Sequence, residues 1–301
     1  MITPFTALRK RPYFEDENAR FYDGDCLKVL SGFPDECIDL IFADPPYNLS
    51  NGGITCKAGK MVSVNKGNWD KSKGFEQDYE FTRQWIAACR RVLKPNGSIW
   101  ISGTPHNIFM VGFALQTLDY KILNEVCWYK PNAPPNLACR YFAHAHESII
   151  WARKSVRSRH KFNYWLMKEM NEGRQMRSLW SIPLTPSSEK LFGKHPTQKP
   201  IELLYRIIAS TSDEGDLVLD PFLGSGTTAV VAKMLNRRVV GIDVDRDFLK
   251  LAVSRYKATA PGPLKMRPKG TKSYSDARRS KSQERQQVLD FMQELERLKG
   301  A

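Results

Sequence analysis

Four consecutive residues that could act together on an amine, Asp44-Pro45-Pro46-Tyr47, directly follow an apolar run. The Asp44 carboxylate and the carbonyl of Pro45 or Pro46 could accept both amine hydrogens and stabilise the positive charge that develops when the nitrogen attacks an electrophile. The prolines fix φ and hold that carbonyl rigidly, and Tyr47 could stack on an aromatic ring carrying the amine. The tetrapeptide therefore predicts group transfer to a weakly nucleophilic amine; a plain turn is the alternative.

A glycine-rich turn, Asp220 to Thr228, lies between an apolar run and a helical pattern. Gly224 and Gly226 have no Cβ to collide with a ligand, and Asp220 can accept from an ammonium group. Asp243 ends another apolar run about twenty residues later, where an acid commonly binds ribose hydroxyls. The two features favour an adenosine-containing cofactor without separating a dinucleotide from S-adenosylmethionine. An ordinary turn with a solvated Asp is the alternative.

Short apolar runs alternate with amphipathic helical stretches along the chain. This alternation predicts an α/β fold with a doubly wound, mostly parallel sheet, whose strands end beside the two motifs. The expected helices are Phe81 to Leu93, Ile201 to Ala209 and Thr228 to Leu235. The expected buried parallel strands are Cys37 to Ala43, Ser98 to Ser102, Ser148 to Ala152, Leu217 to Leu219 and Val239 to Ile242.

Three segments interrupt the alternation. Asn48 to Gly74 is polar and glycine-rich, which predicts a loop beside the site. The region from about 132 to 194 is dense in Arg, Lys, His and aromatic residues and is predicted to be an insertion on the sheet. Residues 258 to 301 are predicted to be a basic tail with a short helix from Val288 to Leu298.

The residues and the order of the motifs resemble those of amino-DNA methyltransferases of the beta group. In that group the catalytic motif comes first along the chain, then the target-recognition region, then the cofactor motif. DPPY comes first here and DPFLGSGTT far downstream. The resemblance extends from about Phe21 to Tyr256. Its other motifs are GDC at 24–26, RVLKPNGSIWISG at 91–103, WYKPN at 128–132, KHPTQKP at 194–200 and GIDVD at 241–245.

The resemblance implies a Rossmann-like methyltransferase domain at 1–257, with a catalytic region at 20–131, target recognition at about 132–194 and a cofactor region at 195–257. Its cofactor would be S-adenosylmethionine. Asp44, Pro45, Pro46 and Tyr47 would act on a base flipped out of the DNA. The implied cofactor residues are Asp25 and Cys26 against the adenine, Asp243 on the ribose, Thr197 and Lys199 at the methionine end, and Asp220, Phe222, Gly224, Ser225, Gly226 and Thr227 in the glycine-rich turn.

The tetrapeptide also bears on the target base. In the family, SPPY accompanies cytosine N4 and NPPY occurs in protein glutamine methyltransferases, so Asp44 favours adenine N6. The segments NLSNGG, GNWDK and NAPPNLACRYFAHAHE look most like adenine methyltransferases of GATC restriction-modification systems. Cytosine-N4 methylation, RNA or protein methylation, and a DNA-binding homologue without catalysis remain alternatives.

Composition fits this interpretation. A formal net charge of +14 suits a polyanionic partner such as DNA, duplex or single-stranded. The six scattered cysteines, and the lack of a signal peptide or membrane span, predict a cytoplasmic protein of a bacterium or phage, associated with the nucleoid. A homodimer and a cognate endonuclease are further expected partners.

Several features have two interpretations. His144, His146 and Glu147 resemble a metal site, but no further ligand cluster accompanies them and the reaction needs no metal. Trp69 could close over a flipped base or anchor in the core. The tail from Lys265 to Arg285 could bind DNA or only aid solubility. Phosphate contact is expected for most of the basic residues Arg140, Arg153, Lys154, Arg157, Arg159, Lys161, Arg174 and Arg177.

Overall fold

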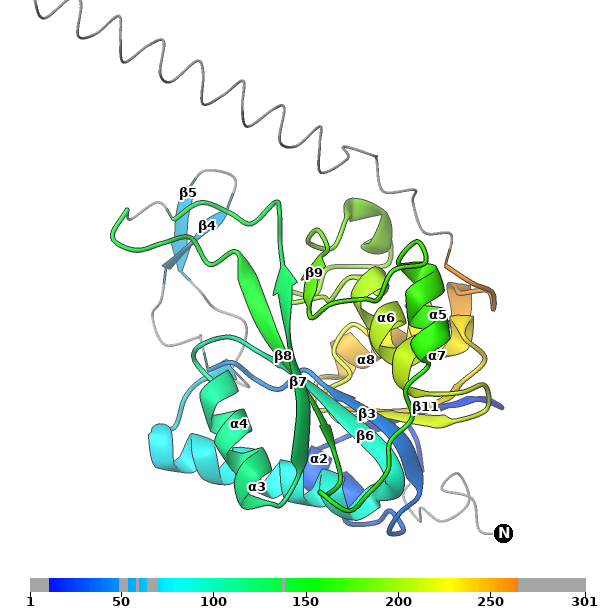
Figure 1. The fold of residues 1–301 in the computed structure, drawn as a ribbon. Coiled ribbons are helices and arrows are strands. Elements are labelled where there is room, and N and C mark those ends of the chain that lie inside the picture. Colours follow the sequence, from blue (N-terminus) through cyan, green and yellow to red (C-terminus); the bar gives the residue numbers. More distant parts are fainter. Residues whose placement is uncertain (1–10, 49–53, 58–59, 64–69, 137–138, 265–301) are drawn as a thin grey trace, which may run out of the picture. The chain divides into compact units, whose positions relative to one another are not determined.

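A single nine-stranded sheet forms the centre of the fold, in the order β1-β2-β11-β10-β3-β6-β8-β7-β9 (Figure 1). The structure is a computed structural model and describes residues 11–48, 54–57, 60–63, 70–136 and 139–264. The strands are β1 (Phe14–Glu15), β2 (Ala19–Asp23), β3 (Ile38–Ala43), β6 (Leu93–Gly103), β7 (Lys121–Tyr129), β8 (His146–Arg153), β9 (Leu179–Ser181), β10 (Leu217–Asp220) and β11 (Arg238–Asp243).

The middle of the sheet is parallel, as predicted. β2, β11, β10, β3 and β6 each run parallel to the next, and β7 and β9 pair in parallel as well. β1 is antiparallel to β2, and β8 is antiparallel to both of its neighbours, β6 and β7. A strand therefore lies where it was predicted, at Ser148 to Ala152, but it is antiparallel to its neighbours, so the predicted parallel direction was wrong.

Helices cover both faces of the sheet because successive side chains of a strand point to opposite sides. Ile41 and Ala43 of β3 pack in the cluster that contains α2 (Cys26–Leu30), α3 (Phe75–Val92) and α4 (Ile108–Thr117). Leu40 and Phe42 pack in the cluster that contains α6 (Ile201–Thr211) and part of α7 (Thr227–Met234). Burial on both faces explains why β3 reads as an unbroken apolar run.

The remaining elements complete the outer layers. α8 (Arg246–Ala258) packs with α7 against β2 and β11, and α5 (Tyr164–Met170) contacts α6. A short 3-10 helix, η2, spans Ser187–Glu189. Residues 48–74, predicted as a loop, contain an antiparallel hairpin, β4 (Ile54–Lys57) with β5 (Lys60–Ser63). Among the described helices, none is long and apolar enough to cross a membrane.

The predicted helices occur with shifted bounds. α3 begins at Phe75, six residues before the predicted start, and ends at Val92. Leu93, predicted as the last residue of this helix, is the first residue of β6. The chain divides into two compact units, residues 1–264 and 265–301. Trp69, the basic tail and its predicted helix lie outside the described residues.

Candidate active site

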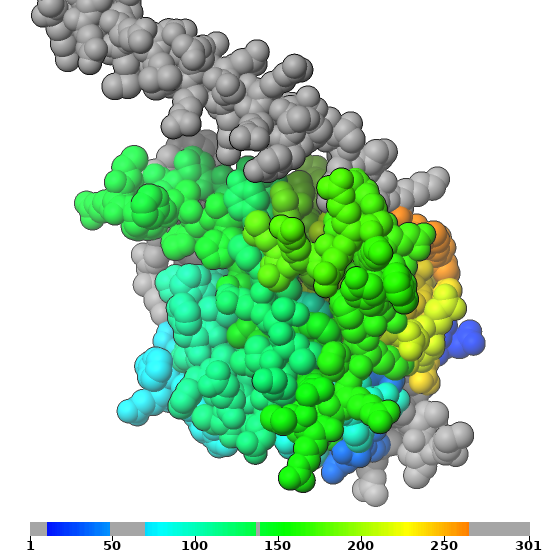
Figure 2. Space-filling model, in the orientation of Figure 1, coloured from blue at the N-terminus to red at the C-terminus, as the bar shows by residue number. Residues whose placement is uncertain are grey.

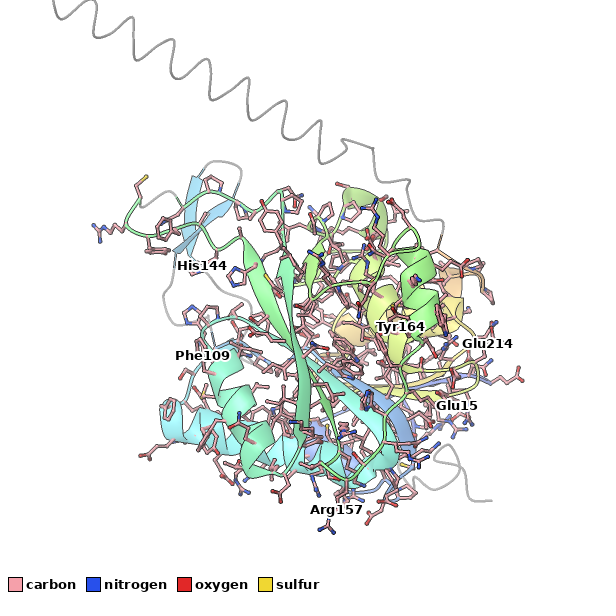
Figure 3. All side chains as sticks on the ribbon, in the orientation of Figure 1. Glu15, Phe109, His144, Arg157, Tyr164 and Glu214 are labelled. Atoms are coloured by element: carbon pink, nitrogen blue, oxygen red, sulfur yellow. The ribbon has the colours of Figure 1, made fainter. Side chains whose placement is uncertain are left out.

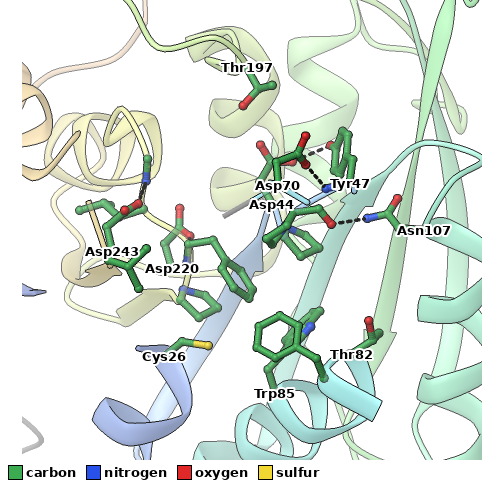
Figure 4. A pocket seen from close by; sticks show the side chains of 18 of the residues that line it. Cys26, Asp44, Tyr47, Asp70, Thr82, Trp85, Asn107, Thr197, Asp220 and Asp243 are labelled. Carbon is green, nitrogen blue, oxygen red and sulfur yellow. Dashed lines mark hydrogen bonds between the residues drawn. The ribbon is translucent and has the colours of Figure 1, made fainter. Parts of the chain in front are cut away.

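A cavity of about 480 Å³ opens where β3, β10 and β11 end, so the two predicted motifs face the same space (Figure 4). The carboxyl ends of parallel strands are where α/β folds place their ligands. Helix α3 closes one side of the cavity through Phe81, Thr82 and Trp85. Every predicted site residue except Gly226 lines this cavity: Asp25, Cys26, Asp44, Pro45, Pro46, Tyr47, Thr197, Lys199, Asp220, Phe222, Gly224, Ser225, Thr227 and Asp243.

The catalytic tetrapeptide is anchored by two side chains from other parts of the chain. The backbone amide of Tyr47 donates to Oδ1 of Asp70 at 2.9 Å, and Nδ2 of Asn107 donates to the carbonyl of Pro46 at 3.5 Å. Asp70 is fully buried and Asn107 nearly so. Buried side-chain partners of this kind fix a backbone segment because leaving either group unpaired costs free energy. Figure 4 shows both side chains beside the tetrapeptide.

The carboxylate of Asp44 accepts four hydrogen bonds. Oδ1 accepts from the hydroxyls of Ser102 and Tyr47, at 2.5 and 2.6 Å. Nζ of Lys199 donates to Oδ1 and to Oδ2, at 2.7 Å each. Ser102 comes from β6, whereas Lys199 precedes α6, so three distant parts of the sequence converge on Asp44. The carboxylate is held in one orientation by these partners.

A second carboxylate continues this network. Oε2 of Glu147 lies 3.4 Å from Nζ of Lys199 and accepts from the Tyr47 hydroxyl at 3.2 Å. Its other oxygen, Oε1, accepts from Nζ of Lys130 at 3.2 Å. Asp44, Glu147, Lys130 and Lys199 thus form a group of two acids and two cations, which we call the charge cluster.

Burial and charge act against each other in the charge cluster. Burial disfavours the charged form of Lys199 and acts to lower its pKa. The negative charges of Asp44 and Glu147 have the larger effect together, so the pKa of Lys199 is raised. Burial likewise favours neutral Glu147, but Lys199 and Lys130 hold the pKa of Glu147 below its usual value. Burial, followed by the charge of Asp44, raises the pKa of Tyr47 far above its usual value, so its phenol stays protonated and donates.

Two predicted positions differ from the expectation. Lys199, expected at the methionine end of the cofactor, has its ammonium group on Asp44. Tyr47, expected to present its ring to a base, is only 5% exposed, and the Lys199 ammonium lies 5.1 Å from its ring centre. The sequence could not indicate either contact, because Lys199 is 155 residues from Asp44.

The opposite end of the cavity carries a buried acid, Asp220, and a partly buried acid, Asp243. Asp243 accepts from the amides of Gly224 and Asp245 at 2.7 and 2.8 Å, and burial raises its pKa to about 6. Asp220 accepts from the Thr228 hydroxyl at 2.6 Å and from the Phe222 amide at 3.0 Å. Burial raises the pKa of Asp220 to about 7. Ionising either acid is costly without a polar ligand, because burial removes the water that would solvate the charge.

Helix α2 contributes the next part of the wall. Oδ1 of Asp25 caps the helix by accepting from the amide of Lys28 at 3.1 Å. Cys26 is buried, and burial followed by the charge of Asp25 raises the pKa of its thiol to about 12, so the thiol stays protonated. Thr197 donates its amide to Nδ1 of His195 at 3.2 Å. Burial lowers the pKa of His195 to about 4, which leaves the ring neutral.

Gly224 and Gly226 have different structural roles. Gly224 has a φ of +51° and lines the cavity, and a Cβ there would lie 3.1 Å from Nε2 of His195. A Cβ on Gly226 would lie 2.6 Å from Cβ of Ala252 on α8. The prediction that Gly226 clears space for a ligand was therefore wrong, since its missing side chain lets α7 pack against α8.

Sequence reasoning missed Asp70, Ser102, Asn107 and Lys130, and it considered Glu147 only as a metal ligand. GNWDK, which contains Asp70, was noted for its resemblance without a role for the carboxylate. Among the residues that the structure describes, no group of three or more His, Cys, Asp or Glu side chains could hold a metal ion.

The basic residues of 132–194 divide between the two ends of the sheet. β8 runs away from the cavity, so the residues after it lie at the opposite end, as His144 and Arg157 illustrate in Figure 3. Lys154 pairs there with Glu36, and Lys161 with Asp213 and Asp216. These lysines therefore pair with carboxylates of the fold itself, whereas phosphate contact was expected for most of the basic residues.

Comparisons with known proteins agree with this site. The family model for DNA methylase matches residues 38–254. The chain is 53% identical over 249 residues to the Type II methyltransferase M2.LlaDCHI of Lactococcus lactis subsp. cremoris, covering 82% of this chain and 93% of the relative. It is also 53% identical to the Type II methyltransferase M2.DpnII of Streptococcus pneumoniae, covering 83% and 94% of the two chains.

Solved structures share the fold. The M1.HpyAVI complex with S-adenosylmethionine has a TM-score of 0.60 at 25% identity, covering 79% of this chain and 98% of that one. The cytosine-N4-specific PvuII DNA methyltransferase has a TM-score of 0.67 at 20% identity, covering 83% and 90%.

The cavity fits the cofactor that these comparisons imply. Asp220 offers a buried carboxylate and Asp243 a partly buried one, Gly224 keeps the wall open, and Nε1 of Trp85 is buried without a hydrogen-bond partner among the described residues. These groups suit a ligand that has hydroxyls, a cationic end and an aromatic base. With the family match over 38–254 and relatives 53% identical, the chain belongs to the DNA methylase family and is a DNA methyltransferase that uses S-adenosylmethionine.

Proposed function

We propose that the chain methylates the N6 amine of adenine within GATC, as the modification enzyme of a restriction-modification system. The observation that carries this proposal is the position of Asp44, whose fixed carboxylate lines the same cavity as the acids Asp220 and Asp243. An amine bound at Asp44 would thus be next to the cofactor's methyl group. An Asp at this position favours adenine over cytosine, as the sequence indicates.

The chemistry follows from the donors and acceptors at the tetrapeptide. Bound S-adenosylmethionine supplies an electrophilic methyl group. The lone pair of the amine forms the new N–C bond while the C–S bond breaks and its electrons stay on sulfur, and the nitrogen then loses one proton to water. Asp44 and the carbonyl of Pro45 or Pro46 bind the two amine hydrogens and stabilise the positive charge in the transition state. Both prolines keep that carbonyl in place.

Each wall of the cavity has a proposed role. Asp243 would bind the ribose hydroxyls of the cofactor and Asp220 its ammonium end, with Asp25 and Cys26 beside the adenine. The glycine-rich turn, including Phe222, Ser225 and Thr227, would surround the remainder. Arg255 holds that turn, donating to the Ser225 carbonyl at 2.7 Å and to the Thr227 hydroxyl at 2.9 Å. The turn is therefore shaped before the cofactor binds.

Support for the recognition site comes from the sequence and from the relatives. NLSNGG, GNWDK and the segment from 132 to 147 resemble GATC-type enzymes. The relatives named M2.DpnII and M2.MboI are Type II methyltransferases, which supports a cognate endonuclease that cuts the same site. Arg140, Arg174 and Arg177 are exposed and are the proposed DNA contacts of the recognition region. Such a protein would work at the nucleoid.

A homodimer is part of the proposal. Phe109 and Phe113, one turn apart on α4, are 75% and 58% exposed, and the ring of Phe113 lies 5.6 Å from Tyr79 of α3. Phe75, one turn before Tyr79, is 73% exposed. Several exposed aromatic rings on two neighbouring helices are typical of an interface. Phe109→Ser with Phe113→Ser is expected to convert the dimer to monomers in analytical ultracentrifugation; an unchanged mass would reject this face.

The test of the function uses oligonucleotides that carry GATC, GANTC or a scrambled site, each as duplex and as single strand. N6-methyladenine confined to GATC is expected by mass spectrometry. Single-stranded GATC is expected to react as well, because an unpaired adenine reaches the cavity without the few kcal/mol that unstacking requires. N4-methylcytosine as the sole product would overturn the assignment of Asp44. Methylation confined to another sequence would reject GATC alone.

A further inference from the structure

Most of the hydrogen-bond acceptor positions of Asp44 are already occupied by its neighbours. An ionised carboxylate has about four acceptor positions. Ser102, Tyr47 and Lys199 already supply four hydrogen bonds, because Lys199 reaches both oxygens. An incoming amine brings one N–H donor to Asp44, since its other hydrogen goes to the carbonyl of Pro45 or Pro46. Oδ1 of Asp44 already accepts from three donors and Oδ2 from Lys199 alone, so the amine N–H must compete with the Lys199 ammonium for Oδ2.

Two of these donors have a second carboxylate within reach. The Tyr47 hydroxyl lies 2.6 Å from Asp44 and 3.2 Å from Oε2 of Glu147. Nζ of Lys199 lies 2.7 Å from both Asp44 oxygens and 3.4 Å from the same Oε2. A displacement of well under 1 Å would thus transfer a donor from one acid to the other without losing a hydrogen bond.

Lysine 199 is the donor best suited to this transfer. Its ammonium group has three N–H donors and four acceptors within 3.4 Å: both Asp44 oxygens, the Tyr47 hydroxyl and Glu147. Its side chain is 6% exposed, so water cannot replace a lost partner. Without Glu147, Lys199 would have no second carboxylate among its described contacts.

Glu147 is fixed in place to receive this donor. It lies on β8 opposite Trp128 of β7, in the interior of the sheet. Lys130 binds its other oxygen at 3.2 Å, which leaves Oε2 directed at Lys199 and Tyr47. The cluster also balances two positive and two negative charges. Removing the charge of Glu147 would leave a net positive charge beside a nitrogen that becomes positive during methyl transfer.

We propose that Glu147 is a positioning residue that accepts the Lys199 ammonium when the target amine binds Asp44. The lysine thus holds the Asp44 carboxylate in one orientation before the base arrives, and releases acceptor positions when it arrives. This inference rests on the proposed role of Asp44. It assigns Glu147 no contact with the substrate, and its effect passes through Lys199.

The test starts with Glu147→Gln and Glu147→Asp in the full chain. Glu147→Gln keeps the size but can present its single oxygen to one lysine only. We expect the single-turnover methylation rate on a GATC duplex to fall about 100-fold, with unchanged affinity for S-adenosylmethionine and DNA. Glu147→Asp keeps the charge and is expected to recover to within about 10-fold of wild type. Glu125→Gln, on the exposed side of β7, is the matched control with an unchanged rate.

A double-mutant cycle separates this role from a general loss of structure. In a Lys199→Met background, Glu147→Gln is expected to change the rate by less than about 3-fold. An equal loss in both backgrounds, equal rates of Glu147→Gln and Glu147→Asp, or a wild-type rate for Glu147→Gln would each overturn the proposal. An active Asp44→Ala would instead refute the role of Asp44, so the two failures are distinguishable.

Discussion

The carboxylate of Asp70 holds the backbone amide of Tyr47 at 2.9 Å, across 23 residues of sequence. Asp70 lies near the end of the predicted polar loop, Asn48 to Gly74, whereas Tyr47 ends the catalytic tetrapeptide. The bond therefore couples the conformation of that loop to the position of the catalytic carbonyl. Each of the following predictions concerns a contact of this kind.

Asp70→Ala should lower the methylation rate, because it frees the Tyr47 amide and lets the tetrapeptide shift. A displacement of about 1 Å can cost about 100-fold in rate. Asp70→Asn retains an acceptor oxygen and should recover most of the activity. Rates from single-turnover assays on a GATC duplex check both variants, and equal rates for the two would contradict the anchoring role.

Asp44→Ala should abolish transfer while cofactor binding survives, because the Asp243 end of the cavity is built by other segments. The expected loss is about 100- to 1,000-fold, the usual effect of removing a group that stabilises transition-state charge. Calorimetry with S-adenosylmethionine supplies the control. Near-normal turnover would remove Asp44 from the mechanism.

Asp243→Ala should chiefly weaken S-adenosylmethionine binding through loss of charge-assisted hydrogen bonds to the ribose. Because burial raises the pKa of Asp243 to about 6, the affinity of the wild type should fall as the pH drops through 6 and the carboxylate gains a proton. Titration calorimetry at pH 5 to 8 checks this. Asp247→Asn, whose side chain is 84% exposed, should keep the wild-type profile, and a flat wild-type profile would reject the role.

Asp220→Asn should stabilise the cofactor-free protein at pH 8. Burial raises the pKa of Asp220 to about 7, above its ordinary value of 3.8. A raised pKa contributes stability that is fully present below pH 3.8 and is lost as the pH rises through 7, because ionisation is disfavoured only in the folded state. The cost at pH 8 is on the order of a few kcal/mol. Thermal melts at pH 5 and pH 8 should show a larger gain for the Asn variant at pH 8 than at pH 5, because the loss in the wild type accumulates between pH 3.8 and pH 7.

Gly226→Ala should destabilise the fold. The new Cβ would lie 2.6 Å from Cβ of Ala252, at a φ of +75° that favours glycine. Overpacking of this kind typically costs about 1–3 kcal/mol, in addition to about 1–2 kcal/mol for backbone strain. Gly173→Ala is the matched control, because Gly173 has the same φ and no atom within 4 Å of its Cβ position. Equal losses in chemical denaturation would show that packing against α8 has no part.

Prediction from the sequence succeeded for elements that one local pattern of residues defines. β3 could be recognised because both its faces are buried, and Asp44 follows it directly. The direction of β8 could not be recognised from its own residues, since a buried strand has the same apolar pattern either way. The absence of a helical pattern between Tyr129 and His146 was the available signal, because a parallel connection normally requires a crossover helix.

The charge cluster was beyond sequence reasoning for a different reason. Its ion pairs join residues far apart in the chain, and none leaves a local pattern. Strand alternation could nevertheless have separated Glu147 from its neighbour His146. Glu147 shares a face with the buried residues Ile149 and Trp151, whereas His146 is exposed. A carboxylate on a buried face needs hydrogen-bond donors or a cation, but its partner cannot be identified from the sequence.

The antiparallel pairing of β7 with β8 has a consequence for how such an enzyme can acquire new specificities. Both ends of the segment from 130 to 145 return to the same edge of the sheet, and Figure 2 shows this green segment projecting from the body of the fold. Its two anchor points are Lys130 and Glu147, which belong to the charge cluster. Substitutions, insertions and deletions between these anchors can alter the projecting surface without moving the strands, since lengthening a surface loop costs little free energy. Evolution can thus exchange the segment that we propose contacts DNA while the catalytic residues are inherited unchanged.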